Sequence, residues 1–237
     1  MSANHFIRSC VCSAFAMWAL GSQTVDAEDE VQLSFASYPA QQDLQPYRLR
    51  TGEKSTLEIN AANQYISDPL TTGVMDTWTL GLFRQRVGRE KEFVPLASCK
   101  SLKSRQQILI LGHPIIPHED EYLLTAIDGS TDHFSYGSFL FLNLTGIKLT
   151  ANLNKVELQI EPGSHTINSP KLLGDEGYIQ AQVFTNKDDK KKGKKILDTR
   201  WPVHRDVRSL IIFYNGANDR ILMHTIRQPS PGGLSDS

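Results

Sequence analysis

An internal repeat is the feature that most constrains how this chain folds. Three segments of the first half align with three of the second: Phe93–Leu111 with Ile196–Tyr214, Trp78–Phe83 with Ile179–Phe184, and Leu123–Ile127 with Leu222–Ile226. The copies are about 100 residues apart, which is much longer than the unit of a solenoid repeat. Each copy is therefore expected to form a complete domain of common size.

Hydrophobic periodicity predicts β-strands in both copies. Apolar and polar residues alternate with period two in Val31–Phe35, Thr56–Ile59, Trp78–Leu82, Val156–Ile160 and Tyr178–Val183. Three short apolar runs bounded by turn residues indicate strands buried on both faces: Ile108–Leu111, Phe139–Leu142 and Leu210–Tyr214. Many short strands separated by turns predict an all-β chain of two tandem antiparallel β-sandwiches, immunoglobulin-like in architecture.

Residues 1–27 have the composition of a cleaved secretory signal peptide. Arg8 supplies a positive charge, Val11–Leu20 is apolar, and Val25-Asp26-Ala27 resembles a small-residue cleavage site. The apolar stretch is about half of the roughly 20 residues that a membrane-spanning helix needs. We therefore expect a periplasmic or secreted mature chain without a transmembrane segment; the alternative is that residues 1–27 remain as an uncleaved anchor. Its expected parts are a first sandwich at 28–128, a second at 129–228 and a disordered tail at 229–237.

Charge and cysteine content bear on the class of protein. The net charge is −1, and it is unchanged when Arg8 and Asp26 leave with the signal. A general nucleic-acid binder is usually strongly basic, so no nucleic-acid partner is expected. Cys99 is the single cysteine of the mature chain and cannot form an internal disulfide. We predict that it is a small buried residue rather than a nucleophile.

Positive charge gathers at the equivalent hairpin tip of each repeat, in residues 84–91 and 186–195. One hypothesis is contact with an anionic surface, namely a lipid headgroup, an acidic envelope polymer or an acidic envelope protein. The residues that would make this contact are Lys190, Lys191, Lys192, Lys194 and Lys195. The alternative is that these lysines solvate a projecting tip and discourage edge-to-edge aggregation.

A second candidate binding surface surrounds Trp201. With Arg200 and Arg205 beside it, the indole is a candidate to stack on a sugar or a proline-rich peptide. The alternative is that Trp201 caps the sandwich core while the arginines pair with nearby acids such as Asp198 and Asp206.

The repeat alignment also compares single positions between the two halves. It places Ser98 opposite Trp201, so the tryptophan is specific to the second domain. It places Arg105 opposite Arg208. An arginine shared by both copies suggests a structural role, tying a loop to backbone carbonyls.

Few motifs indicate catalysis. The segment His113–Glu121 contains two histidines and three carboxylates, which are metal-ligand types. Its spacing matches no recognised motif, and its prolines favour an extended loop. The sequence has no nucleophile elbow and no glycine-rich phosphate loop. We predict no catalytic residue, no metal and no cofactor.

The second repeat carries the pattern Phe139–Asn143, then Pro162-Gly163, Arg200-Trp201-Pro202 and Leu210–Tyr214. This pattern resembles a group of uncharacterised exported bacterial proteins with two tandem β-sandwich repeats. The resemblance covers most of the mature chain and implies no activity. The leading hypothesis is therefore a non-catalytic binding or assembly module of the cell envelope. The alternatives are an exported metal-dependent hydrolase that uses the His113–Glu121 loop, and a purely structural spacer.

Overall fold

A computed structural model of the chain describes residues 30–39, 46–85, 91–114, 121–170, 177–186 and 193–231. The expected signal peptide lies outside these residues. Within them the regular elements are strands and one 3-10 turn, η2 (Ala217–Asp219). No helix in the described ranges has the length and apolar character to cross a membrane.

Each half of the chain contributes eight of the described strands. The first half contains β1 (Glu30–Tyr38), β2 (Tyr47–Arg50), β3 (Thr56–Ile59), β4 (Leu70–Gly73), β5 (Thr77–Gln85), β6 (Lys91–Lys100), β7 (Gln106–Gly112) and β8 (Leu123–Asp128). The second half contains β9 (Phe139–Asn143), β10 (Lys148–Leu153), β11 (Val156–Ile160), β12 (His165–Asn168), β13 (Tyr178–Asn186), β14 (Lys194–Pro202), β15 (Val207–Asn215) and β16 (Ile221–Pro229).

Both halves are sandwiches of two four-stranded sheets with the same strand order. The first half has the sheets β4-β1-β7-β8 and β3-β2-β5-β6. The second has β12-β9-β15-β16 and β11-β10-β13-β14, so β9 to β16 take the places of β1 to β8 in turn. The predicted all-β class and the two tandem sandwiches are confirmed.

The strand pairing differs from an immunoglobulin-like, wholly antiparallel sandwich. In each half one pair is parallel, β1 with β7 and β9 with β15. Strands A and B of an immunoglobulin constant domain share a sheet, whereas β1 and β2 lie in opposite sheets. A parallel pair needs a long connection, which the strands between β1 and β7 provide. Periodicity could not reveal this, because it shows which side chains face inward and not which strands are neighbours.

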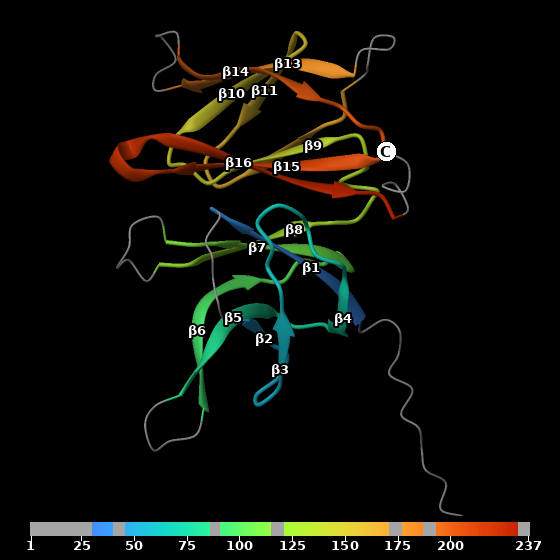
Figure 1. Cartoon of the computed structure of the whole chain (residues 1–237), viewed down its shortest axis with the longest axis vertical. Helices are drawn as coiled ribbons and strands as arrows, with labels where there is room; N and C mark the ends of the chain where they lie inside the picture. The colour runs from blue at the N-terminus through green and yellow to red at the C-terminus, as the bar shows by residue number, and fades with distance from the viewer. Residues whose placement is uncertain are drawn as a thin grey trace, which may run out of the picture.

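The two sandwiches lie face to face, so the molecule is a stack of four sheets (Figure 1). The sheet that contains β1 and β7 packs on the sheet that contains β9 and β15. Side chains from both sandwiches form one buried cluster there, which we call the shared core. Its thirteen members are Ala36, Tyr38, Ile66, Ile108, Ile110, Ile127, Phe134, Leu140, Leu142, Leu210, Ile212, Tyr214 and Ile226. Two further clusters fill the interiors of the first and second sandwiches.

The shared core explains the continuous apolar runs. Residues 108–111, 139–142 and 210–214 are buried along their whole length, which confirms the prediction of strands covered on both faces. Successive side chains enter different cores. On β7, Ile110 faces the neighbouring sandwich and Leu109 faces the interior of its own.

The same alternation corrects the sequence alignment by one residue in this region. The alignment pairs Ile108 with Ile211, but Ile108 lies in the shared core and Ile211 lies inside the second sandwich. Pairing Ile108 with Leu210 places both in the shared core. Because a shift of one residue sends every side chain to the opposite face, Arg105 is not the structural counterpart of Arg208.

The segment that joins the sandwiches, between the end of β8 and the start of β9, is held by side chains from both. We call it the joining segment. The Asp128 carboxylate accepts a hydrogen bond of 2.7 Å from the Ser104 hydroxyl. Arg208 donates through Nη1 to the carbonyl oxygens of Gly129 (2.7 Å) and Phe134 (2.8 Å). Arg208 therefore does tie a loop to backbone carbonyls, although Arg105 does not share the role.

Other contacts between the halves lie at strand β16. Tyr65, between β3 and β4, forms an isolated bridge with Arg227. The Nε2 of His224 donates to the Asn63 carbonyl oxygen at 2.5 Å. Strand β16 runs to Pro229, and residues 232–237, most of the expected disordered tail, lie outside the described ranges.

Candidate functional site

Trp201 lies on β14 and packs on the core of the second sandwich. Its ring stacks on Phe139, with centroids 5.9 Å apart and planes at 27°, and lies 5.9 Å from the ring of Phe141. The side chain is half-buried. These contacts agree with the core-capping alternative, and binding by the remaining ring edge stays a prediction.

Arg200 does not share a face of the strand with Trp201. Arg200 precedes Trp201 on the strand and is exposed on the opposite face, because successive strand residues point to opposite sides. Arg205 is exposed in the turn between β14 and β15. Asp198 pairs with Lys195 rather than with an arginine, with Nζ and Oδ2 2.6 Å apart.

The basic tip of the second repeat is described only in part. Lys194 and Lys195 begin β14 and are exposed, whereas Lys190, Lys191 and Lys192 lie outside the described residues. The hydrogen bond from Lys195 lowers the pKa of Asp198, so the charge of Lys195 is offset by its neighbour. Contact between this tip and an anionic partner stays a prediction.

The histidine- and carboxylate-rich loop is also only partly described, because residues 115–120 fall outside the ranges. His113 is buried between two tyrosines, with ring centroids 5.9 Å from Tyr47 and 5.8 Å from Tyr122. The described residues contain no group of three or more side chains that would hold a metal ion. A metal site in this loop would depend on His118 and on other residues of 115–120, which lie outside the described ranges.

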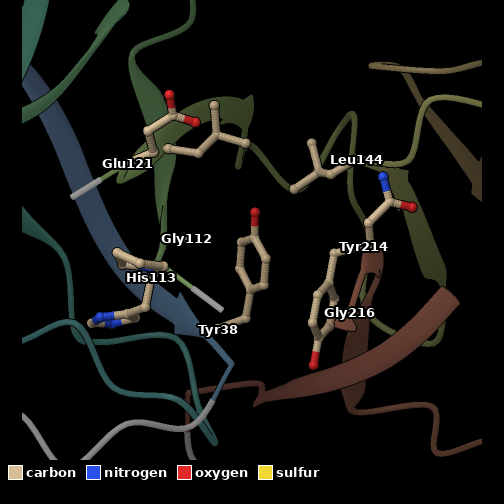
Figure 2. A pocket seen from close by; sticks show the side chains of 10 residues that line it. Tyr38, Gly112, His113, Glu121, Leu144, Tyr214 and Gly216 are labelled. Carbon is tan, nitrogen blue, oxygen red and sulfur yellow. The ribbon is translucent and has the colours of Figure 1, made fainter. Parts of the chain in front are cut away.

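The structure forms a cavity that sequence reasoning did not single out, at one end of the contact between the sandwiches (Figure 2). We call it the tyrosine-end cavity. Its volume is about 310 Å³, and its lining comes from both sandwiches. The lining residues are Tyr38, Gly112, His113, Pro114, Glu121, Leu123, Leu144, Tyr214, Asn215 and Gly216.

Two tyrosines from different sandwiches meet in this cavity. Tyr38 ends β1 and Tyr214 lies near the end of β15, with ring centroids 5.2 Å apart and planes tilted by 53°. Burial raises the pKa of both phenols, and the proximity of Tyr214 adds to the effect on Tyr38. The hydroxyls are therefore neutral near pH 7. In Figure 2 the Tyr38 hydroxyl points toward the space between Glu121 and Leu144.

Gly112 makes room for the Tyr38 ring. A Cβ at this position would lie 2.5 Å from the Tyr38 hydroxyl oxygen and 2.8 Å from Cζ. A glycine at the end of β7 therefore permits the close approach.

The charge of the cavity lining is one-sided, since the described lining includes the carboxylate of Glu121 and no lysine or arginine.

A scan against protein-family models finds no match, and a search of curated proteins finds none either. The fold and the cavity therefore define the class by themselves. The chain is an all-β protein of two tandem sandwiches that share a core, with a cavity where they meet.

Proposed function

We propose that this chain is an exported, non-catalytic binding module of the cell envelope, and that a small ligand occupies the tyrosine-end cavity. The observation that carries the proposal is the position of this cavity between two domains fixed by a shared core. Small-ligand sites occur preferentially at domain interfaces. A volume of about 310 Å³ falls at the lower end of their usual range of about 300–1,000 Å³.

The lining favours a small amphipathic ligand that is neutral or positively charged. Leu123 and Leu144 offer apolar surface, and the Tyr38 hydroxyl offers a donor and an acceptor. Glu121 attracts a cation and repels an anion. Because their raised pKa values keep both phenols protonated near neutral pH, little tyrosinate is present to act as a base or nucleophile. The tyrosines are therefore suited to binding rather than to proton transfer.

Titration with two probes of similar size, benzylamine and benzoate, tests this proposal. We expect benzylamine to raise the melting temperature and to shift the NMR signals of Tyr38 and Tyr214, and benzoate to do so much less. Leu144→Trp, which fills the cavity, is expected to abolish the effect. Glu121→Gln is expected to weaken benzylamine binding while leaving the fold unchanged.

The control is Leu102→Trp, which places the same bulky side chain at a position outside the cavity lining. This variant should bind benzylamine like the parent protein. Binding that survives Leu144→Trp, or that favours benzoate, would contradict the assignment.

A structural spacer is the second candidate, because the shared core holds the two sandwiches in one orientation. For a spacer, neither probe binds and Leu144→Trp changes only stability. The metal-dependent hydrolase is the third hypothesis. Stoichiometric zinc in the purified protein that is lost on His118→Ala would favour it.

A further inference from the structure

The opposite end of the contact between the sandwiches has a second cavity, of about 230 Å³, which we call the arginine-end cavity. Its lining includes Gln32, Ser34, Thr131, Tyr136, Arg208 and Gln228. Arg208 is the one charged residue of the described lining. The two cavities therefore differ in charge, with a carboxylate at one end of β15 and a guanidinium at the other.

The guanidinium of Arg208 is buried, with 5% of the residue exposed. Its Nε donates to Oε1 of Gln228 at 2.7 Å, and its Nη1 donates to the two carbonyl oxygens of the joining segment. The rings of Phe134 and Tyr136 lie 4.9 Å and 5.3 Å from its central carbon. These contacts use Nε and Nη1, and the Nη2 amino group has no acceptor among the described residues.

Arg208 lines the cavity, and Nη2 is the guanidinium nitrogen that its contacts with the described residues leave available to a ligand. In the described part of the chain no buried side-chain nitrogen or oxygen lacks a hydrogen-bond partner, so this group is not sealed inside the protein. The salt bridges found among the described residues involve other side chains, and none neutralises Arg208. A cation that is largely desolvated without a carboxylate is costly, and a bound anion would offset this cost.

We propose that the arginine-end cavity binds a small oxyanion, with a carboxylate as the preferred group. Nη2 of Arg208 supplies the charged hydrogen bond, and the hydroxyls of Thr131 and Tyr136 supply neutral ones. One guanidinium surrounded by neutral donors matches a single negative charge better than the higher charge of phosphate. The site is independent of the ligand proposed for the tyrosine-end cavity.

The test is a titration of the full chain with sodium acetate, sodium phosphate and sodium chloride at constant ionic strength. We expect acetate to raise the melting temperature above the chloride control, as a ligand of the native state does. Acetate should also shift the ¹⁵N side-chain signals of Arg208. Phosphate is expected to have a smaller effect. Stabilisation by phosphate without any by acetate would overturn the carboxylate preference.

Variants that spare the joining segment keep the proposal falsifiable, because substitution of Arg208 itself removes two ties to that segment. Tyr136→Phe retains the ring beside Arg208, and Thr131→Val retains the volume. Loss of one hydrogen bond worth about 1 kcal/mol corresponds to about a 5-fold weaker acetate affinity for each variant.

Tyr178→Phe is the matched control, because this tyrosine is exposed and lies outside the cavity. It should leave acetate binding unchanged, as should Leu144→Trp. An acetate effect no larger than that of chloride, or one that survives the double variant Thr131→Val/Tyr136→Phe, would overturn the site.

Discussion

Gln107 shows how a single polar residue organises the first sandwich. It is 2% exposed, and its Oε1 accepts hydrogen bonds from the Trp78 indole (2.9 Å) and the Leu102 backbone amide (3.2 Å). Its Nε2 donates to the carbonyl oxygens of Leu102 and Ser104, both at 2.9 Å. In the sequence, a glutamine next to an apolar run is typical of the end of a strand. Only the fold reveals that its amide fastens the turn between β6 and β7 to Trp78.

Cys99 is expected to react slowly in the native protein. Burial raises its pKa to about 12, so little of the nucleophilic thiolate exists near pH 8. In a Cys10→Ser/Cys12→Ser background, labelling by iodoacetamide can be followed by mass spectrometry. We expect native labelling to be slower than labelling in urea by about a hundredfold or more. Cys99 is half-buried in the structure, and equal rates would contradict the partial burial of its thiol.

Acid sensitivity near the joining segment is expected to depend on His165. Burial and the nearby charge of His133 lower the pKa of His165 below 6.5. As the pH falls below 6.5, the unfolded chain therefore takes up a proton before the folded chain does. The free energy of unfolding should decrease over this range, and His165→Gln should reduce the decrease. Urea denaturation at pH 7 and at pH 5 measures both.

Asp128 gives the free energy of unfolding a second dependence on pH, in a more acidic range. Partial burial opposes the shift, but hydrogen bonds from Ser104 and Ser130 lower its pKa below 3.8. Its contribution to stability is thus present above pH 3.8 and is lost at lower pH. Ser104→Ala, which removes the hydroxyl that donates to Asp128, should reduce the loss in this lower window. A variant that flattened both windows equally would contradict the assignment to His165.

At the scale of elements, the outer hairpins β5–β6 and β13–β14 each carry one tryptophan at the same cross-strand pair. It lies on the first strand of one hairpin and on the second strand of the other. Trp78 on β5 faces Cys99, and Trp201 on β14 faces Ile179. Cys99, rather than Ser98, is therefore the counterpart of Trp201. Each sandwich fills this layer with one large and one smaller side chain, which is how a core keeps its volume while its residues change.

This exchange predicts energetic coupling between positions 78 and 99. Trp78→Ile alone should destabilise the protein by about 3 kcal/mol, through the cavity it leaves and the lost hydrogen bond to Gln107. Cys99→Trp alone should cost about 1–3 kcal/mol by overpacking. The double variant should recover at least about 1 kcal/mol of the sum. A urea-denaturation double-mutant cycle measures this coupling.

The control for the cycle is Trp78→Ile combined with Ser98→Trp. Ser98 hydrogen-bonds to Thr79 on the exposed side of the hairpin, so a tryptophan there does not reach the core. No recovery is expected. Equal recovery from positions 98 and 99 would show that the coupling does not arise from core packing.

At the scale of the whole molecule, the shared core makes the two sandwiches one folding unit. The inner sheets have apolar residues on both faces, so neither sandwich alone covers its own surface. Separation would expose a contiguous apolar face, which is unfavourable in water. The expected consequence is a single cooperative unfolding transition rather than one for each sandwich.

Tryptophan fluorescence tests this expectation. In a Trp18→Phe background, Trp201→Phe leaves Trp78 as the reporter of the first sandwich, and Trp78→Phe leaves Trp201 as the reporter of the second. The two urea transitions should coincide. Leu49→Ala, inside the first sandwich, should lower the free energy of unfolding that each reporter gives by about 2–5 kcal/mol. A shift of the Trp78 transition alone would show that the sandwiches unfold independently.

The sequence predicted the larger part of the fold and little of the candidate site. Alternation and turn residues are local properties of strands, so they identified the β class, the two sandwiches and the strands buried on both faces. The lining of the tyrosine-end cavity left no comparable pattern. Tyr38, Gly112 and Tyr214 are ordinary residues at strand ends, and they meet only because the sandwiches stack.

By itself, the sequence determined that this chain builds the same sandwich twice, because each copy carries its own alternating apolar faces. The tertiary structure alone decided where those faces point. It placed one face of each inner sheet against the other sandwich, made β1 and β7 parallel neighbours, and brought Tyr38 beside Tyr214. The physical reason is that apolar burial is non-directional. A strand pattern records that a face must be covered, and only the packed molecule specifies by what.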